Sequence, residues 1–282
     1  LDVGKMVAFM VGQTRPIWDF EDVGDWWTRA NPDCIYPIIA IPTTAGTGSE
    51  VGRASVITNS ETFEKKIIFH PKILPSVVIC DPELTMSMPK SITAGTGLDA
   101  FAHCVEAFSS PHFHPMSHGI ALEGMRLVIE NLGRAYHCGT DIKARANMMC
   151  AAMMGATAFQ KGLGAIHAMS HPVGALVHSH HGTTNAVCML PVLKLNRVAI
   201  KDRFDKITNY LGIRGGFEGF CSFVKEFNIS LGIPDRLSDL GVKNDQIEGL
   251  VVKALNDPSC QGNPVELNHQ NMRVLFEEAM AG

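Results

Sequence analysis

The chain has 282 residues, which is enough for one large domain or two ordinary ones. Its formal net charge of −4 and pI near 6.3 leave no excess of basic residues, so we expect neither nucleic acid nor a membrane as a partner. No apolar run is long enough to span a bilayer, and no signal peptide opens the sequence. The eight cysteines are scattered without a CxxC pair, which indicates free thiols. We therefore expect a globular cytoplasmic protein.

The first ninety residues combine one helical pattern with several strand patterns. The opening LDVGKMVAFMVG has apolar residues at helical spacing, and a polar connection follows at 13–35. Apolar and β-branched runs then predict strands at 36–42, 54–59, 66–70 and 76–81. This stretch is expected to form a small α/β unit.

From about residue 90 the pattern becomes helical. Apolar periodicity predicts helices at 98–109, 116–131, 141–159, 163–176, 183–199, 202–211, 216–230, 244–255 and 269–280. The change of pattern places a domain boundary near residue 90, with an α/β part at 1–89 and a helical part at 90–282. The predicted fold class is α+β, in two domains.

Two pairs of polar side chains at i,i+4 spacing stand out in the helical part. Asp99 and His103 lie in GLDAFAHCVEAF, His167 and His171 lie in GLGAIHAMSHP, and His181 follows as the last residue of HSHH. Residues four apart share one face of a helix, so each pair can direct both side chains to one point. A carboxylate and several imidazoles at one point predict a site for a divalent metal such as zinc or ferrous iron.

The alternative for each histidine is a hydrogen-bonded residue of the core. Two such pairs in apolar context give the metal site about the same weight as the core alternative, because a buried Asp99 is costly without a partner. The spacing from His167 to His171 also matches the zinc-protease motif HExxH, but Ala168 occupies the position of the glutamate that acts as general base. Peptide hydrolysis by that mechanism is excluded.

A glycine-containing loop, TTAGTGSE at 43–50, directly follows the first predicted strand. Its small residues would let backbone amides and hydroxyls approach phosphate oxygens. It is not a Walker A loop, since no lysine follows its last glycine, and it is not a GxGxxG motif. From these residues alone, a phosphate-binding loop and a plain strand-to-helix turn both remain open.

A set of segments in fixed order resembles a known family. The segments are TTAGTGSE, KIIFHPKILPSVVICDPELT, AGTGLDAFAHCVEAF, KGLGAIHAMSHPVGA, HHGTTNAVCMLP and the tail GNPVELNHQNMRVLFEEAM. They resemble the iron-containing (group III) alcohol dehydrogenases over nearly the whole chain. The resemblance implies a dehydroquinate-synthase-like fold, with an N-terminal α/β dinucleotide-binding domain and a C-terminal all-helical metal domain. This division agrees with the predicted boundary near residue 90.

The resemblance also assigns roles to individual residues. The positions that match metal ligands are Asp99, His103, His167 and His181. His171 matches a catalytic histidine that lies beside the nicotinamide and the substrate. The positions that match cofactor-binding residues are Thr43, Thr44, Thr47 and Ser49 in the glycine loop, Lys65 near the ribose and Phe159 near the nicotinamide ring.

Three further polar residues lie close to these positions in the sequence. Glu106 shares a helix face with Asp99 and His103, and we expect it to contact a ligand or form a salt bridge. His178 and His180 are expected to face solvent or to lie just outside the ligand set.

The activity implied by the resemblance is hydride transfer between a small alcohol or aldehyde and NAD or NADP. A divalent metal, Fe2+ or Zn2+, would activate the substrate oxygen, and His171 would relay the proton. A homodimer is also implied. The alternatives on the same fold are a maleylacetate reductase and an enzyme of the glycerol dehydrogenase type.

The sequence departs from the family pattern at its beginning. In the family a glycine-rich loop that binds the pyrophosphate lies just before a segment like LDVGK, whose Asp2 and Lys5 are present, but this chain begins at Leu1. We therefore expect the first strands of the dinucleotide-binding domain to be missing from the chain. The non-enzymatic alternative is a metal-binding fragment that is inactive because it lacks this loop.

Overall fold

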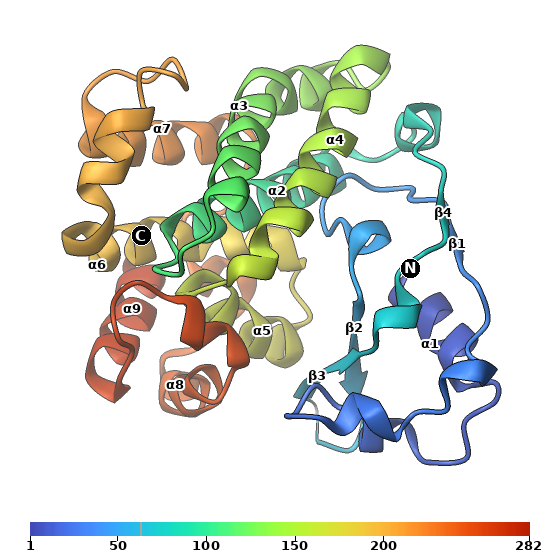
Figure 1. Cartoon of the computed structure of the whole chain (residues 1–282). Helices are drawn as coiled ribbons and strands as arrows, with labels where there is room; N and C mark the ends of the chain where they lie inside the picture. Colours follow the sequence, from blue (N-terminus) through green and yellow to red (C-terminus); the bar gives the residue numbers. More distant parts are fainter. Residues whose placement is uncertain (63) are drawn as a thin grey trace.

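The computed structural model describes residues 1–62 and 64–282. The strands and α1 (Asp2–Met10) lie on one side of the molecule, and the long helices that follow form the other side (Figure 1). The two sides meet where β3 (Glu64–Phe69) packs against α5 (Ala165–Val177), and where residues 49–51 and 82–85 pack against α4 (Ile142–Ala158). Among the described residues, none of the helices combines the length and the apolarity that a membrane crossing requires.

Two small pairs of strands make up the sheet structure of the N-terminal side. β2 (Ala54–Asn59) pairs antiparallel with β3, with Ala54 opposite Phe69. β1 (Ile39–Ala40) pairs parallel with β4 (Val77–Val78). Beneath α1, a separate apolar core contains Phe9, Phe20 and Ile68, all fully buried.

The strands predicted at 54–59 and 66–70 are confirmed, with β3 beginning two residues early. Those predicted at 36–42 and 76–81 form ladder pairs over only two residues each, so their predicted lengths were wrong. β1 and β4 pair only with each other within the described residues. Several apolar side chains of these two strands, such as Ile39 and Val77, are exposed.

The helical side is built from eight helices within the described residues. They are α2 (Lys90–Ser109), α3 (Pro115–His137), α4 (Ile142–Ala158), α5, α6 (His181–Ile207), α7 (Gly216–Ser230), α8 (Ile247–Leu255) and α9 (His269–Ala281). Two predictions were wrong here. α2 begins eight residues before the predicted start, and the helices predicted at 183–199 and 202–211 are one continuous helix, α6.

The central element is α2, which packs against α3, α4 and α6 (Figure 1). Every residue from Thr93 to Ser109 is buried, because α2 has neighbouring helices on all sides. Its early start follows from this packing: Gly and Thr at 93–97 are poor helix formers, but close contact with neighbouring helices compensates for their low propensity.

Two cations hold the carboxyl end of α2. The Nζ atom of Lys161 donates to the carbonyls of Ala107 and Ser110 at 2.9 and 2.7 Å. Arg203 donates to the carbonyls of Phe108, Ser109 and Ser110 at 3.1 to 3.2 Å. Positive charge at this end satisfies carbonyls that have no partner within the helix and complements the helix dipole. The helix that carries Asp99 and His103 is therefore fixed at its end.

Glycine determines how closely α6 approaches α2. A Cβ atom at Gly182 would lie 1.9 Å from the carbonyl oxygen of Gly95 and 2.8 Å from Cβ of Asp99. No side chain larger than hydrogen fits at this crossing. The contact places the first turn of α6, which begins with His181, directly over Asp99.

We predict that Gly182→Ala separates α6 from α2, because the added methyl group overlaps the backbone of α2. The expected loss is about 1–3 kcal/mol in the free energy of unfolding, measured by denaturant titration. Gly133→Ala is the matched control, since a Cβ at Gly133 in α3 meets nothing within 4 Å. The control should be neutral or stabilising by about 0.5–1 kcal/mol. Equal effects of the two substitutions would contradict the proposed close contact.

Candidate metal centre

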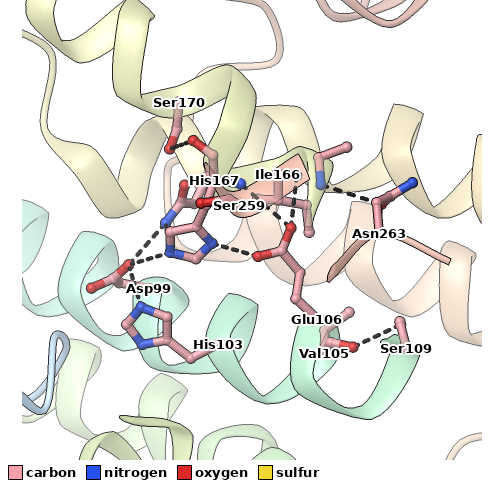
Figure 2. A network of polar contacts seen from close by, with 12 residues as sticks. Asp99, His103, Val105, Glu106, Ser109, Ile166, His167, Ser170, Ser259 and Asn263 are labelled. Carbon is pink, nitrogen blue, oxygen red and sulfur yellow. Dashed lines mark hydrogen bonds and ion pairs between the residues drawn. The ribbon is translucent and has the colours of Figure 1, made fainter. Parts of the chain in front are cut away.

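Three imidazoles converge on one carboxylate oxygen at the crossing of α2, α5 and α6. Oδ1 of Asp99 lies 3.6 Å from Nε2 of His103, 3.7 Å from Nε2 of His167 and 3.5 Å from Nε2 of His181. Figure 2 shows the side chains of Asp99, His103 and His167 directed toward one another from α2 and α5. The i,i+4 spacing within α2 and the glycine contact with α6 together bring these four side chains to one place.

The closest group within this set has three members. The ligand atoms of Asp99, His103 and His167 all lie within 4.8 Å of one another, and all three residues are buried. His181 lies outside this group, although its Nε2 is the imidazole nitrogen nearest to Asp99. Its side chain is 26% exposed, whereas that of His167 is 2% exposed. His181 therefore forms the side of the cluster that is open to solvent.

The outer nitrogens of two imidazoles have fixed partners. Nδ1 of His167 lies 2.5 Å from Oε2 of Glu106, whose other oxygen accepts from the backbone N–H of Ile166 at 2.7 Å (Figure 2). Nδ1 of His181 lies 3.4 Å from the hydroxyl of Ser170. A carboxylate can only accept, so Glu106 holds a proton of His167 on Nδ1. The expected contact between Glu106 and a candidate ligand is present.

The charges of the cluster follow from burial and proximity. Burial opposes ionisation of Asp99, but the surrounding imidazoles hold its pKa well below the usual range. Burial lowers the pKa of His103 to about 4 and also lowers the pKa of His181, so both are neutral at pH 7. At His167 burial is outweighed by the carboxylates of Glu106 and Asp99, which raise its pKa to about 9.

The donor set fits a divalent metal ion. One ionised carboxylate and several imidazoles are the ligands that zinc and ferrous iron take in proteins. Nδ1 of His103 is buried and has no hydrogen-bond partner among the described residues, so protein contacts alone leave this ring incompletely satisfied. A metal ion binding to His167 would compete with the proton that this imidazole holds near neutral pH.

His171 lies beside the cluster and has a partner that the sequence analysis missed. Its ring stacks on that of His181 at a centroid distance of 5.3 Å. Its Nδ1 lies 2.7 Å from Oδ2 of Asp257, and the other oxygen of Asp257 accepts from the backbone N–H of Ser259 at 2.9 Å. Burial lowers the pKa of His171, whereas the carboxylate of Asp257 raises it. Asp257 is 86 residues away in the sequence, and no helical periodicity connects it to His171.

A cleft of about 200 Å3 opens beside His171, between β3 and the end of α8. Its lining includes Lys65 from β3, Ala175 from α5, and Lys253 and Asp257 from the region of α8. Burial lowers the pKa of Lys65, although Asp99 and Asp257 oppose this effect. Lys65 therefore lines the same cleft as Asp257, the carboxylate that holds His171.

The glycine loop packs on the helices through its glycines and presents hydroxyls to solvent. A Cβ at Gly48 would lie 2.3 Å from Cβ of Ala156 in α4, and one at Gly46 would lie 2.8 Å from Thr96 in α2. The threonines predicted to bind cofactor, Thr43, Thr44 and Thr47, are exposed. Ser49 is half-buried, and its hydroxyl donates to Asp2 of α1.

Phe159, one of the predicted cofactor residues, contacts a metal candidate. Its ring lies 4.7 Å from the ring of His103, measured between centroids. His178 and His180 are exposed, in agreement with the expectation that they face solvent. His178 adopts a left-handed conformation with φ of 54° and ends α5, so it serves the turn between α5 and α6.

Comparison with known proteins decides the family. Residues 93–280 match the C-terminal model of the Fe-containing alcohol dehydrogenase family, and residues 1–82 match the model of iron-containing alcohol dehydrogenases. The chain belongs to the iron-containing alcohol dehydrogenase family. The resemblance seen in the sequence motifs and the expected fold, a short N-terminal α/β region followed by a helical domain, are both confirmed.

Individual relatives cover nearly the whole chain. A 4-hydroxybutyrate dehydrogenase of Cupriavidus necator is 37% identical over 99% of this chain and 75% of the relative. A 1,3-propanediol dehydrogenase of Klebsiella pneumoniae is 35% identical over 99% of this chain and 73% of the relative.

Solved structures agree with this assignment. A 1,3-propanediol oxidoreductase superposes with a TM-score of 0.92 at 34% identity, over 99% of this chain and 74% of that one. A sulfoacetaldehyde reductase from Bifidobacterium kashiwanohense, solved in complex with NAD+, superposes with a TM-score of 0.89 at 30% identity, over 99% and 73% of the two chains.

Proposed function

We propose that the chain is a metal-dependent alcohol dehydrogenase that transfers hydride between a small alcohol or aldehyde and NAD or NADP. The observation that carries the proposal is the convergence of three imidazoles on Asp99, directly beside the pair formed by His171 and Asp257. In this proposal residues 1–89 contribute to the cofactor side of the site, and residues 90–282 contribute the metal side.

The metal ligands in this proposal are Asp99, His103, His167 and His181. A bound Fe2+ or Zn2+ supplies polarisation of the alcohol or carbonyl oxygen, and the nicotinamide supplies or accepts the hydride. The protein contributes orientation: Glu106 holds the ring of His167, and Ser170 contacts the outer nitrogen of His181. The exposed side of His181 is where substrate would approach.

His171 is the proposed proton acceptor during alcohol oxidation. With Nδ1 donating to Asp257, the lone pair of its Nε2 is available to the substrate side. Stacking on His181 places this ring next to a proposed ligand without making it one. Asp257 is a positioning residue, because it acts on the reaction through His171.

The cofactor side is proposed from the loop, the cleft and one aromatic ring. Thr43, Thr44, Thr47 and Ser49 would contact the cofactor with their hydroxyls and backbone amides. Lys65 lines the cleft beside His171, where a dinucleotide ribose would lie in this proposal. Phe159, which contacts His103, would pack near the nicotinamide ring. His171 lines the cleft and also stacks on His181 of the metal cluster.

The direct test is turnover of reduced cofactor by the metal-loaded chain. We expect NADH or NADPH to be oxidised when a small aldehyde is added, with the aldehydes of 4-hydroxybutyrate and 1,3-propanediol as first candidates, since relatives carry those names. Maleylacetate with reduced cofactor and glycerol with oxidised cofactor test the alternative activities. Asp99→Asn should remove activity. A chain that binds metal but neither binds the cofactor nor turns over any of these compounds would support the metal-binding alternative.

The pH profile tests the role of Asp257. Its carboxylate raises the pKa of His171, so Asp257→Asn should lower that pKa. Alcohol oxidation needs neutral His171. In the variant, the acid limb of the pH–rate profile for alcohol oxidation should therefore move to lower pH. We expect kcat to fall by about 10- to 100-fold because the ring loses its orientation, with metal content unchanged. Asp245→Asn, an exposed control, should change neither quantity. An unshifted acid limb in Asp257→Asn would contradict this role.

A further inference from the structure

Asn185 lies inside the proposed ligand set, and no feature of the sequence analysis selected it. It follows His181 by four residues on α6, so both side chains lie on one face of the helix. Its Nδ2 lies 2.8 Å from Oδ1 of Asp99, 3.2 Å from Nε2 of His167 and 3.3 Å from Nε2 of His181. Asn185 is completely buried. A single amide group is therefore in contact with three of the four proposed ligands.

The donors and the acceptor of the Asn185 amide do not pair well with the polar groups around them. Its NH2 group has two hydrogens but faces three groups, Oδ1 of Asp99 and the Nε2 atoms of His167 and His181, while its Oδ1 is buried with no partner among the described residues. An orphaned buried oxygen costs about 1–3 kcal/mol. Such a cost is often found where a side chain serves a ligand rather than the fold.

A cation bound between Asp99, His167 and His181 would resolve this mismatch. Positive charge between Asp99, His167 and His181 repels the NH2 end of the amide and attracts its carbonyl end. The two ends of an asparagine side chain exchange by rotation about the last torsion angle, with no movement of the backbone. Amide oxygens are accepted ligands of divalent ions, either directly or through a bound water molecule.

We propose that Asn185 is a member of the metal centre and turns its Oδ1 toward the metal. This inference rests on the proposed function, since it requires that Asp99, His167 and His181 bind a metal ion. It assigns the amide oxygen as an additional oxygen donor at the site. The alternative is that Asn185 is only a hydrogen-bond donor that holds Asp99 in place.

Two substitutions of nearly equal size separate these roles. Asn185→Asp keeps an oxygen at the Oδ1 position and removes the N–H donors, whereas Asn185→Leu removes both. The measurements are the Zn2+ and Co2+ affinities of the full chain, by competition with a chelator, and the visible absorption of bound Co2+, which reports the donors around the ion. We expect Asn185→Leu to weaken binding by about 10- to 100-fold and to change the cobalt spectrum.

Under the same conditions, Asn185→Asp should bind both metals at least as tightly as the unmodified chain. Asn131→Leu is the control for the loss of a buried amide, because Asn131 is equally buried but bonds to Leu127, Arg134 and Asn147 of α3 and α4. It should leave metal affinity unchanged. If Asn185→Leu is poorly folded, the metal affinity of Asn185→Asp still tests the role of Oδ1.

The outcomes distinguish failure of this inference from failure of the proposed function. No metal binding by the unmodified chain would overturn both. Metal binding by the unmodified chain, with equal affinity and spectrum in Asn185→Leu, would overturn the role of Asn185 alone. Weaker binding by Asn185→Asp than by the unmodified chain would show that the N–H donors matter and would likewise overturn the role of Oδ1.

Discussion

The site depends on a negative charge buried in the most enclosed helix of the molecule. Asp99 is 2% exposed, and an ionised carboxylate at such a place is costly unless other groups compensate. Its partners come from the same helix, from α5 and from α6, so the position of Asp99 is where three helices must meet. The close contact of Gly182 with Gly95 lets α6 approach α2. Lys161 and Arg203 hold the carboxyl end of α2 in place.

One arrangement recurs around the site. Three of the four imidazoles at the site have Nδ1 held by an oxygen from outside the ligand set, whereas Nδ1 of His103 has no partner among the described residues. Glu106 does this for His167, Asp257 for His171 and Ser170 for His181. These contacts fix tautomer and ring orientation within the protein itself, so little reorganisation is needed when a ligand binds. Because two of the three oxygens belong to carboxylates, the same contacts also set the protonation of the histidines.

The sequence predicts those contacts of the site whose residues lie within a few positions of one another in the chain. The pairs Asp99–His103 and His167–His171 follow from helical periodicity, and Glu106 follows from one further turn of the same face. Asp257 reaches His171 through a turn after α8, at a separation that no periodicity encodes. Asn185 did have a local signal, its i,i+4 spacing from His181, but an amide was not weighed as a partner of imidazoles.

The fold was predictable to a similar extent. Helix patterns located most of the helical side, but α2 begins earlier than predicted because tertiary packing overrides the low propensity of its glycines and threonines. The predicted break in α6 falls at Ile200 and Lys201, which are both helical in the structure. The patterns at 36–42 and 76–81 predicted longer strands, yet β1 and β4 each have one partner strand among the described residues and expose several of their apolar side chains. Strand length depends on neighbours that a local pattern does not contain.

The most direct test of the central claim is the metal content of the purified chain after exposure to Fe2+ or Zn2+, compared with that of Asp99→Asn. The substitution preserves the size of the side chain and removes the charge on which the imidazoles converge. The account predicts about one tightly bound ion per chain in the unmodified protein and little or none in the variant. A variant that retains its metal, or an unmodified chain that takes up none, would contradict the account.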